Sequence, residues 1–357
     1  MNRIATLLIA SALVAPTLQA QEQVRAGQRA TLAAGNTVEI FNAVGEVTLR
    51  RATGSSVEVT ATPQGSEGGQ LQFFTDTEGG RARFRVVFPD VDQIAAPEGW
   101  GGRTQLHLRA DGTFGGDNDD NWGRRRRGDQ VDIGGSRGFR GYANLEIGVP
   151  DGVEIIVRLA VGRVNVDGVN ARAVIDLWSA NADATNIAGD WLFDTGSGDV
   201  NVRGARGTLK IDTGSGAGIV SGMQGDLLNI DTGSGSVDAT DVQVDRFVFD
   251  TGSGSVRARR ITARRGEADT GSGDVEIEYT GGTVDDLVID TGSGSARLTL
   301  PDNVSARVVV DTGSGGVTVN RSGAIFERRG DDGTVLRFGD GRGRIRIDTG
   351  SGNVVIR

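Results

Sequence analysis

Carboxylate and hydroxyl side chains recur together in one pentapeptide, Asp-Thr-Gly-Ser-Gly, which dominates the second half of the sequence. It begins at eight positions: Asp194, Asp212, Asp231, Asp250, Asp269, Asp290, Asp311 and Asp348. Carboxylates in such a motif can act as general acids or bases, or can bind cations. The copies follow one another at steps of 18 to 21 residues, with a last step of 37. This spacing decides which chemistry is possible.

Proteolysis is one interpretation of a single copy. The run Phe193-Asp194-Thr195-Gly196-Ser197 has the form of the active-site loop of pepsin-like aspartic proteases. In those enzymes two such loops bring two carboxylates together to share a proton and activate water. Eight equivalent aspartates at a regular spacing form a row with no reserved pair, so we reject the aspartic protease interpretation.

Calcium binding is a second interpretation, because aspartate- and glycine-rich repeats can hold ions between turns. The calcium nonapeptide places Gly-Gly-x-Gly before its aspartate, and the order is reversed in this sequence. A separate acidic cluster at Asp117 to Asp120 lies in a stretch rich in glycine and charge, where a solvated loop is the simpler interpretation. We therefore assign no metal site and expect no cofactor.

Nucleophilic catalysis and phosphate binding have little support. The only histidine, His107, lies in the alternating run Gln105-Leu106-His107-Leu108-Arg109, which is typical of a strand surface. Phosphate-binding glycine loops precede a helix, and no helical pattern follows any Gly-Ser-Gly copy. No catalytic and no cofactor-binding residue is assigned.

The elements around the motif are short strands. Alternating runs such as Phe247-Val248-Phe249 precede each copy, and runs such as Val256-Arg257-Ala258 follow it. Self-similarity near twenty residues indicates a solenoid, in which each repeat buries its apolar side only by stacking on its neighbours. The sequence thus predicts an all-β fold, a β-solenoid with a period of 18–21 residues and a handedness left open. We expect the glycines to supply unusual backbone angles and each aspartate to cap its own turn.

Four regions follow from composition. Residues 1–20 combine Arg3, an apolar run and Ala20 at a cleavage point, which predicts a secretory signal peptide. Residues 21–63 read as N-terminal degenerate coils, 64–142 as an irregular β insertion with a mobile glycine- and charge-rich loop at 112–141, and 143–357 as the regular solenoid. Within the solenoid, residues 325–343 read as one degenerate coil, and the chain end as the closing strand of the last coil.

Two tryptophans receive different predictions. Trp178 takes the place of the first turn glycine in its coil, so we expect it to face outward and cover the neighbouring insertion. Exposed, it could instead stack on a sugar. Trp191 occupies the position that Leu228 takes in its own coil, and should be core.

Composition excludes several classes of function. The formal net charge is −9, which argues against general binding to nucleic acids or anionic membranes. Cysteine is absent, so disulfides and thiol chemistry are excluded. The apolar run within residues 1–20 is interrupted by Pro16, Thr17 and Gln19 too early to span a membrane, and no other apolar run is long enough.

The recurring units from Asp194 to Val355, with looser copies at Asn42 to Leu49 and Ala160 to Val166, resemble the bacterial toast-rack domain family, also grouped with adhesins built from β-strand repeats. The resemblance implies an all-β repeat domain outside the cytoplasmic membrane and carries over no functional residue. We expect an exported, non-enzymatic protein, periplasmic or at the cell surface, that forms a structural or adhesive surface toward an unknown envelope protein or polysaccharide. The alternative is a carbohydrate-active β-solenoid enzyme, a polysaccharide lyase or hydrolase, with carboxylates and arginines in a groove.

Overall fold

The computed structural model describes residues 21–357 except 36, 101–102, 116–129, 282 and 329–332. The predicted signal peptide and the Asp117 to Asp120 cluster therefore lie outside the described residues. In the described part of the chain, no helix has the length and apolar character needed to cross a membrane.

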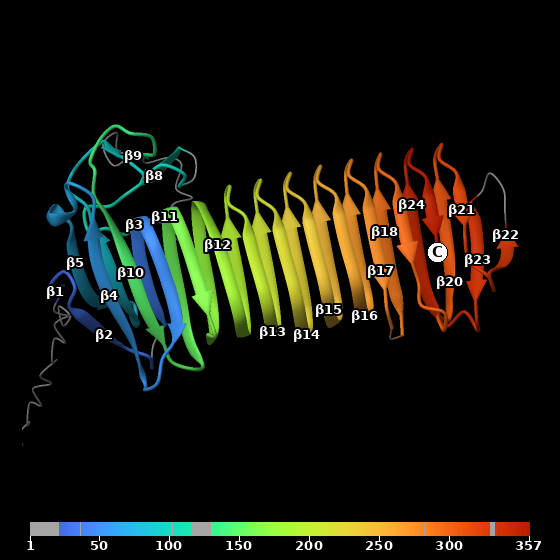
Figure 1. The fold of residues 1–357 in the computed structure, drawn as a ribbon, viewed down its shortest axis with the longest axis horizontal. Coiled ribbons are helices and arrows are strands. Elements are labelled where there is room, and N and C mark those ends of the chain that lie inside the picture. The colour runs from blue at the N-terminus through green and yellow to red at the C-terminus, as the bar shows by residue number, and fades with distance from the viewer. Residues whose placement is uncertain (1–20, 36, 101–102, 116–129, 282, 329–332) are drawn as a thin grey trace, which may run out of the picture.

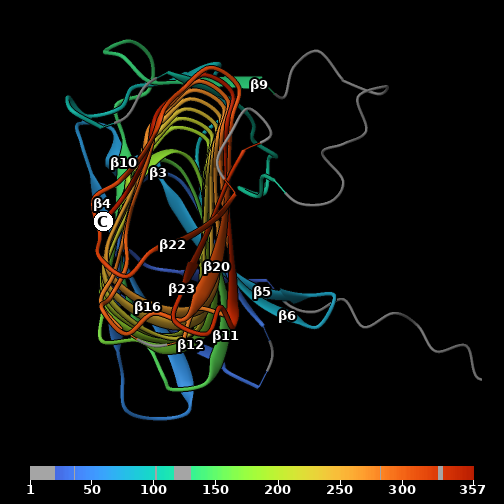
Figure 2. The ribbon, with the colours of Figure 1, turned by 90° about the vertical axis from the view of Figure 1, so that its right-hand side faces the viewer.

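The long body is a β-solenoid of stacked coils whose strands run parallel and in register (Figure 1). Seen along the stack, the coils superimpose as flattened loops around a filled interior (Figure 2). The strands that build it are β3 (Val38–Arg51), β11 (Val153–Asp167), β12 (Asn170–Thr195), β13 (Val200–Thr213), β14 (Gly218–Thr232), β15 (Val237–Thr251), β16 (Val256–Thr270), β17 (Val275–Tyr279), β18 (Asp286–Thr291), β19 (Ala296–Thr299), β20 (Ala306–Thr312), β21 (Val317–Val319), β24 (Gly343–Thr349) and β25 (Val354–Ile356).

Alternation within each coil explains the stack. In β15 the apolar side chains of Val237, Phe247 and Phe249 are fully buried, and they alternate with outward-facing residues such as Asp238 and Val248. A single coil cannot cover these side chains, so each coil is stabilised by the coils above and below it. The predicted start of the solenoid before the first clean motif is confirmed, since β11 pairs in parallel with both β3 and β12.

One corner of the coil was not anticipated from the sequence. Six successive coils bend at a residue in the left-handed region: Gly168, Asn186, Gly204, Gly222, Asp241 and Arg260 all have φ between 53° and 72°. Glycine and asparagine adopt this conformation at low cost, whereas an arginine there is uncommon. Because the residue type at this corner varies from coil to coil, no repeated residue marks it in the sequence.

The N-terminal end of the stack is covered by a head of mostly antiparallel strands (Figure 1). It comprises β1 (Glu22–Val24), β2 (Arg29–Ala33), β4 (Ser56–Gln64), the short 3-10 helix η1 (Gly68–Gln70), β5 (Gln72–Glu78), β6 (Arg81–Val87) and β10 (Tyr142–Val149). Strands β6 and β10 both pair in parallel with β3, which joins the head to the first coil.

A separate three-stranded sheet stands beside the head, made of β7 (Gln93–Ile94), β9 (Gln130–Ile133) and β8 (Thr104–His107). Of the mobile loop expected over 112–141, residues 116–129 lie outside the described residues, and the expectation is wrong for Gln130–Ile133, which form a strand. Val131 and Ile133 alternate with polar residues and are buried, which is a strand pattern that the surrounding glycines obscured.

The C-terminal end of the stack departs from sequence order. Strand β24 pairs with β18 on one side and with β20 on the other, so the last coil of the sequence lies inside the stack. Strand β23 (Thr334–Phe338) pairs antiparallel with the outer edge of β20, and β22 (Ile325–Arg328) pairs with β23. The interpretation of 325–343 as a degenerate coil is wrong: it is an antiparallel cap that returns the chain into the stack.

Candidate functional site

The repeated aspartates form one row along an edge of the solenoid. Parallel pairing places Asp194, Asp212, Asp231, Asp250, Asp269, Asp290, Asp348 and Asp311 opposite one another, in that order. All except Asp348, which is half-buried, are exposed. Neighbouring carboxylates are therefore about one strand spacing apart, roughly 5 Å.

The threonine of the motif, and not the aspartate, caps the turn. Thr251 is fully buried; its hydroxyl accepts a hydrogen bond from the Gly254 amide (3.0 Å) and donates one to the Gly235 carbonyl of the preceding coil (2.8 Å). The same pair of bonds occurs at Thr213, Thr232, Thr270 and Thr291. The predicted aspartate cap is wrong, because the motif aspartates of the described chain accept no hydrogen bond from their own turns.

The motif glycines are needed for space and not for their backbone angles. None of them has φ in the left-handed region, contrary to the expectation from sequence. A Cβ placed on Gly254 would lie 1.8 Å from the carbonyl oxygen of Gly235, and Gly273 and Gly294 meet the same obstacle one and two coils further on. Successive turns thus stack backbone on backbone.

Partial desolvation, together with charge repulsion along the row, raises carboxyl pKa values. The pKa of Asp194, Asp231 and Asp269 lies above the usual range, first because of partial burial and then because of neighbouring aspartates. Among the described residues, the counter-ions of the row stand near its ends. Arg158 pairs with Asp176 (3.2 Å), whose charge acts on Asp194, and Arg346 pairs with Asp348 (2.9 Å).

Beside the carboxylates runs a second exposed row, made by the serines of the motif: Ser197, Ser215, Ser234, Ser253, Ser272, Ser293, Ser314 and Ser351. We call the two rows together the Asp/Ser ladder. Within the described residues, no group of three or more histidine, aspartate or glutamate side chains is placed to hold a metal ion.

The single chemistry-bearing residues occupy structural positions. Trp178 is half-buried and its ring meets Phe114 of the insertion edge to face, 5.3 Å between centroids, which confirms the prediction that it covers the insertion. Trp191 is buried and stacks on Phe193, as predicted. His107 ends strand β8 and is half-buried.

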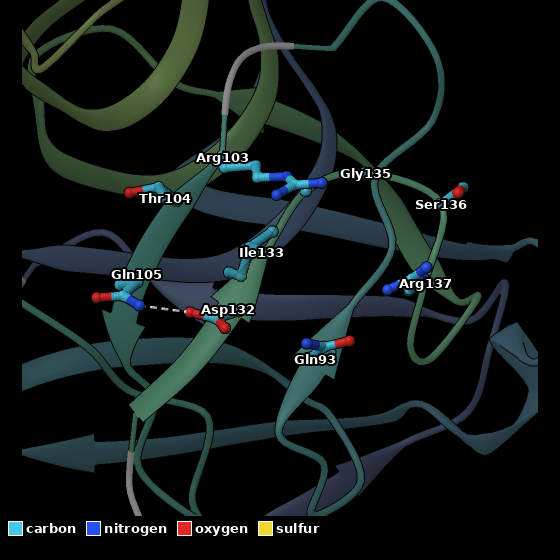
Figure 3. A pocket seen from close by; sticks show the side chains of 10 residues that line it. Gln93, Arg103, Thr104, Gln105, Asp132, Ile133, Gly135, Ser136 and Arg137 are labelled. Carbon is cyan, nitrogen blue, oxygen red and sulfur yellow. Dashed lines mark hydrogen bonds between the residues drawn. The ribbon is translucent and has the colours of Figure 1, made fainter.

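A hollow of about 640 Å³ lies on the three-stranded sheet, and none of its lining residues belongs to the ladder (Figure 3). Its wall is polar: Gln93, Arg103, Thr104, Gln105, Asp132, Ile133, Gly134, Gly135, Ser136 and Arg137. Sequence reasoning missed it, because it is built by β7, β8 and β9 and the loop after β9, which read as an irregular insertion. Two arginines flanking a glycine-rich loop were the only signal.

Comparison with solved structures gives distant similarities. A "putative lipid binding protein" from Parabacteroides distasonis is 13% identical, with a TM-score of 0.39 over 95% of this chain and 97% of that one. A "putative adhesin" from Bacteroides fragilis is 9% identical, with a TM-score of 0.35 over 96% and 98%. A "putative cell adhesion protein" from Clostridium sporogenes is 10% identical, with a TM-score of 0.18 over 95% and 98%.

No curated protein matches the chain. The sequence profile of one family, Toastrack DUF4097, matches residues 154–357, which is more than half of the sequence and includes every copy of the motif. The matched region begins in β11 and extends to β25, so it covers the stack except for β3. The chain belongs to the Toastrack DUF4097 family.

Proposed function

We propose that this chain is an exported, non-enzymatic β-solenoid that acts as a structural or adhesive surface at the cell envelope. Family membership and the stacked fold support a repeat protein whose regular spacing serves architecture. The features of residues 1–20 support export.

The observation that carries the proposal is the Asp/Ser ladder. It repeats one pair of exposed polar side chains at each strand spacing along the stack, on turns that the buried threonines hold rigid. A periodic, rigid surface of this kind suits many weak contacts with an extended partner, whose combined effect exceeds that of any single contact.

Adhesion tests the proposal. The purified mature chain should bind intact bacterial cells or isolated envelopes, and changing Asp231 and Asp250 to Asn should weaken this binding. The matched control changes two other aspartates, Asp226 and Asp238, which lie outside the ladder and form no ion pair within the described residues. If both variants bind as well as the parent, the ladder has no part in adhesion. If periplasmic and surface fractions lack the mature chain, the protein is not exported.

A carbohydrate-active enzyme is the second candidate, and its expected feature is a groove with carboxylates and arginines from separate strands. One hollow, between β3, β4 and β10, has Arg29, Arg50, Glu58 and Glu146 in its wall. Arg29 already pairs with Glu58 (3.0 Å), so Glu146 is the carboxylate left for acid–base chemistry. Cleavage of a polysaccharide by the chain, abolished by Glu146→Gln, would favour the enzyme.

A further inference from the structure

We propose that the hollow on the three-stranded sheet is a binding site for an acidic saccharide, a hydroxyl-rich chain that carries carboxylate groups. The site lies on the insertion and is separate from the Asp/Ser ladder, so it stands independently of the adhesive role proposed for that edge.

Positive charge is the first observation. Arg103 and Arg137 both line the hollow, and neither has a carboxylate partner among the residues that the structure describes. The one acidic group in the wall, Asp132, accepts a hydrogen bond from Gln105 (2.7 Å). Two unpaired guanidinium groups facing one hollow favour an anion, and arginine binds carboxylates through two parallel hydrogen bonds.

The wall is also arranged in advance. The loop from Gly134 to Phe139 is fixed on β7 by backbone hydrogen bonds, including Phe139 N–H to the Gln93 carbonyl (2.9 Å) and Gly134 N–H to the Ile94 carbonyl (3.0 Å). Gly135 has φ of +70°, and the guanidinium of Arg103 lies close to it, since a Cβ on Gly135 would be in ordinary contact with Nη2 at 3.5 Å. Arg103 therefore lies beside this loop, and Arg137 lies on the other side of the hollow (Figure 3).

The remaining wall indicates a hydrophilic ligand. Gln93, Thr104 and Ser136 offer amide and hydroxyl groups, and the only large apolar residue, Ile133, is itself buried. A volume of about 640 Å³ suits a short oligomer better than a single small ion. Arginines on two sides of the hollow could each bind a carboxylate on a different sugar unit of the saccharide. The amide and hydroxyl groups of the wall could form hydrogen bonds with sugar hydroxyls.

Calorimetric titration of the purified mature chain with a trigalacturonate tests the assignment, with neutral maltotriose and inorganic phosphate as comparison probes. We expect binding of trigalacturonate that weakens with added salt, no measurable binding of maltotriose, and weaker binding of phosphate. Arg103→Gln and Arg137→Gln should each reduce affinity about tenfold or more, which is the usual effect of losing a hydrogen bond to a charged group.

Arg257→Gln is the matched control, because Arg257 is exposed on β16 and has no ion-pair partner in the described part of the chain. Unchanged melting temperatures in all three variants separate a binding defect from a folding defect. Parent-like affinity in the Arg103→Gln/Arg137→Gln double variant, equal binding of maltotriose, or no binding of trigalacturonate would overturn the assignment. Binding of phosphate as tight as that of trigalacturonate would show a simple anion site instead.

Discussion

Within the motif, burial determines which side chain stabilises the turn and which one is available at the surface. Alternation along the strand turns the aspartate outward and the threonine inward, as at Asp250 and Thr251. A buried hydroxyl between two backbone groups must satisfy both, and threonine does so as donor and acceptor at once. The motif aspartate is therefore free for surface chemistry, whereas the threonine and glycines hold the turn.

Replacing Thr251 by Val should lower the free energy of unfolding by about 1–3 kcal/mol, because it removes the hydroxyl partner of a part-buried amide and a part-buried carbonyl. Thr251→Ser keeps the hydroxyl and should cost less than about 1 kcal/mol. Asp250→Asn, one residue away but exposed, should change stability by no more than about 0.5 kcal/mol. Chemical denaturation of the three variants checks the order, and a larger loss for Asp250→Asn than for Thr251→Val would contradict it.

Gly254→Ala should be far more damaging than its size suggests. Its Cβ would meet the carbonyl oxygen of Gly235 at 1.8 Å, so two stacked turns would have to separate. We expect a loss of about 3 kcal/mol or more, at the upper end for overpacked cores. Gly281→Ala is the control, because a Cβ there meets nothing within 4 Å. Thermal melting of the pair measures the difference; similar melting temperatures would show that the turns can spread.

At the scale of the element, each coil places like charges next to like charges. Two unit charges about 5 Å apart repel by about 1 kcal/mol in water, and the repulsion is reduced by salt. The ladder therefore costs stability that the buried faces of the same coils offset. The turn needs only the threonines and glycines. A row of mutually repelling aspartates is therefore consistent with a binding role at the surface.

The raised pKa values of Asp231 and Asp269 fix the sign of the pH dependence. A carboxyl whose pKa is higher in the folded than in the unfolded state favours folding at low pH and opposes it once both states are ionised. The variant Asp231→Asn/Asp269→Asn should therefore be more stable than the parent at pH 7, by up to about 1 kcal/mol at low salt. The gain should vanish near pH 3, below the ordinary aspartate pKa of about 3.9. A gain that is independent of pH would rule out charge repulsion as its cause.

Strand alternation and the repeat period were enough to predict the solenoid, its early start at β11 and the burial of Trp191. They could not distinguish the roles of Asp250 and Thr251, because both residues recur with the same period. The arginine-lined hollow was also beyond reach, since Arg103 and Arg137 meet only through the pairing of short strands across an irregular segment.

At the scale of the whole molecule, the coils are equivalent to one another, so their order in the stack need not follow their order in the sequence. The register of β18, β24 and β20 is the same, with Asp290, Asp348 and Asp311 in one row. Any two of these coils could therefore stack directly on each other. The order in the structure follows from the cap, in which β23 occupies the outer edge of β20 and a turn with Gly339 and Gly341 at positive φ leads back to the inner edge.

Disulfide formation can test this order, because the chain has no cysteine of its own. With cysteines at positions 290 and 348, adjacent parallel strands place the Cα atoms about 5 Å apart, within the range of a disulfide, and oxidation should join them. The pair at 290 and 311 is separated by a coil, at about 10 Å, and should stay reduced.

Truncation before Gly343 should then let β20 move onto β18, because Val308 and Val310 would meet Leu287 and Ile289 in matching register. In the truncated chain the 290 and 311 pair should oxidise, as seen by a mobility shift under non-reducing conditions. Oxidation of that pair in the full-length chain would instead show that the coils stack in sequence order.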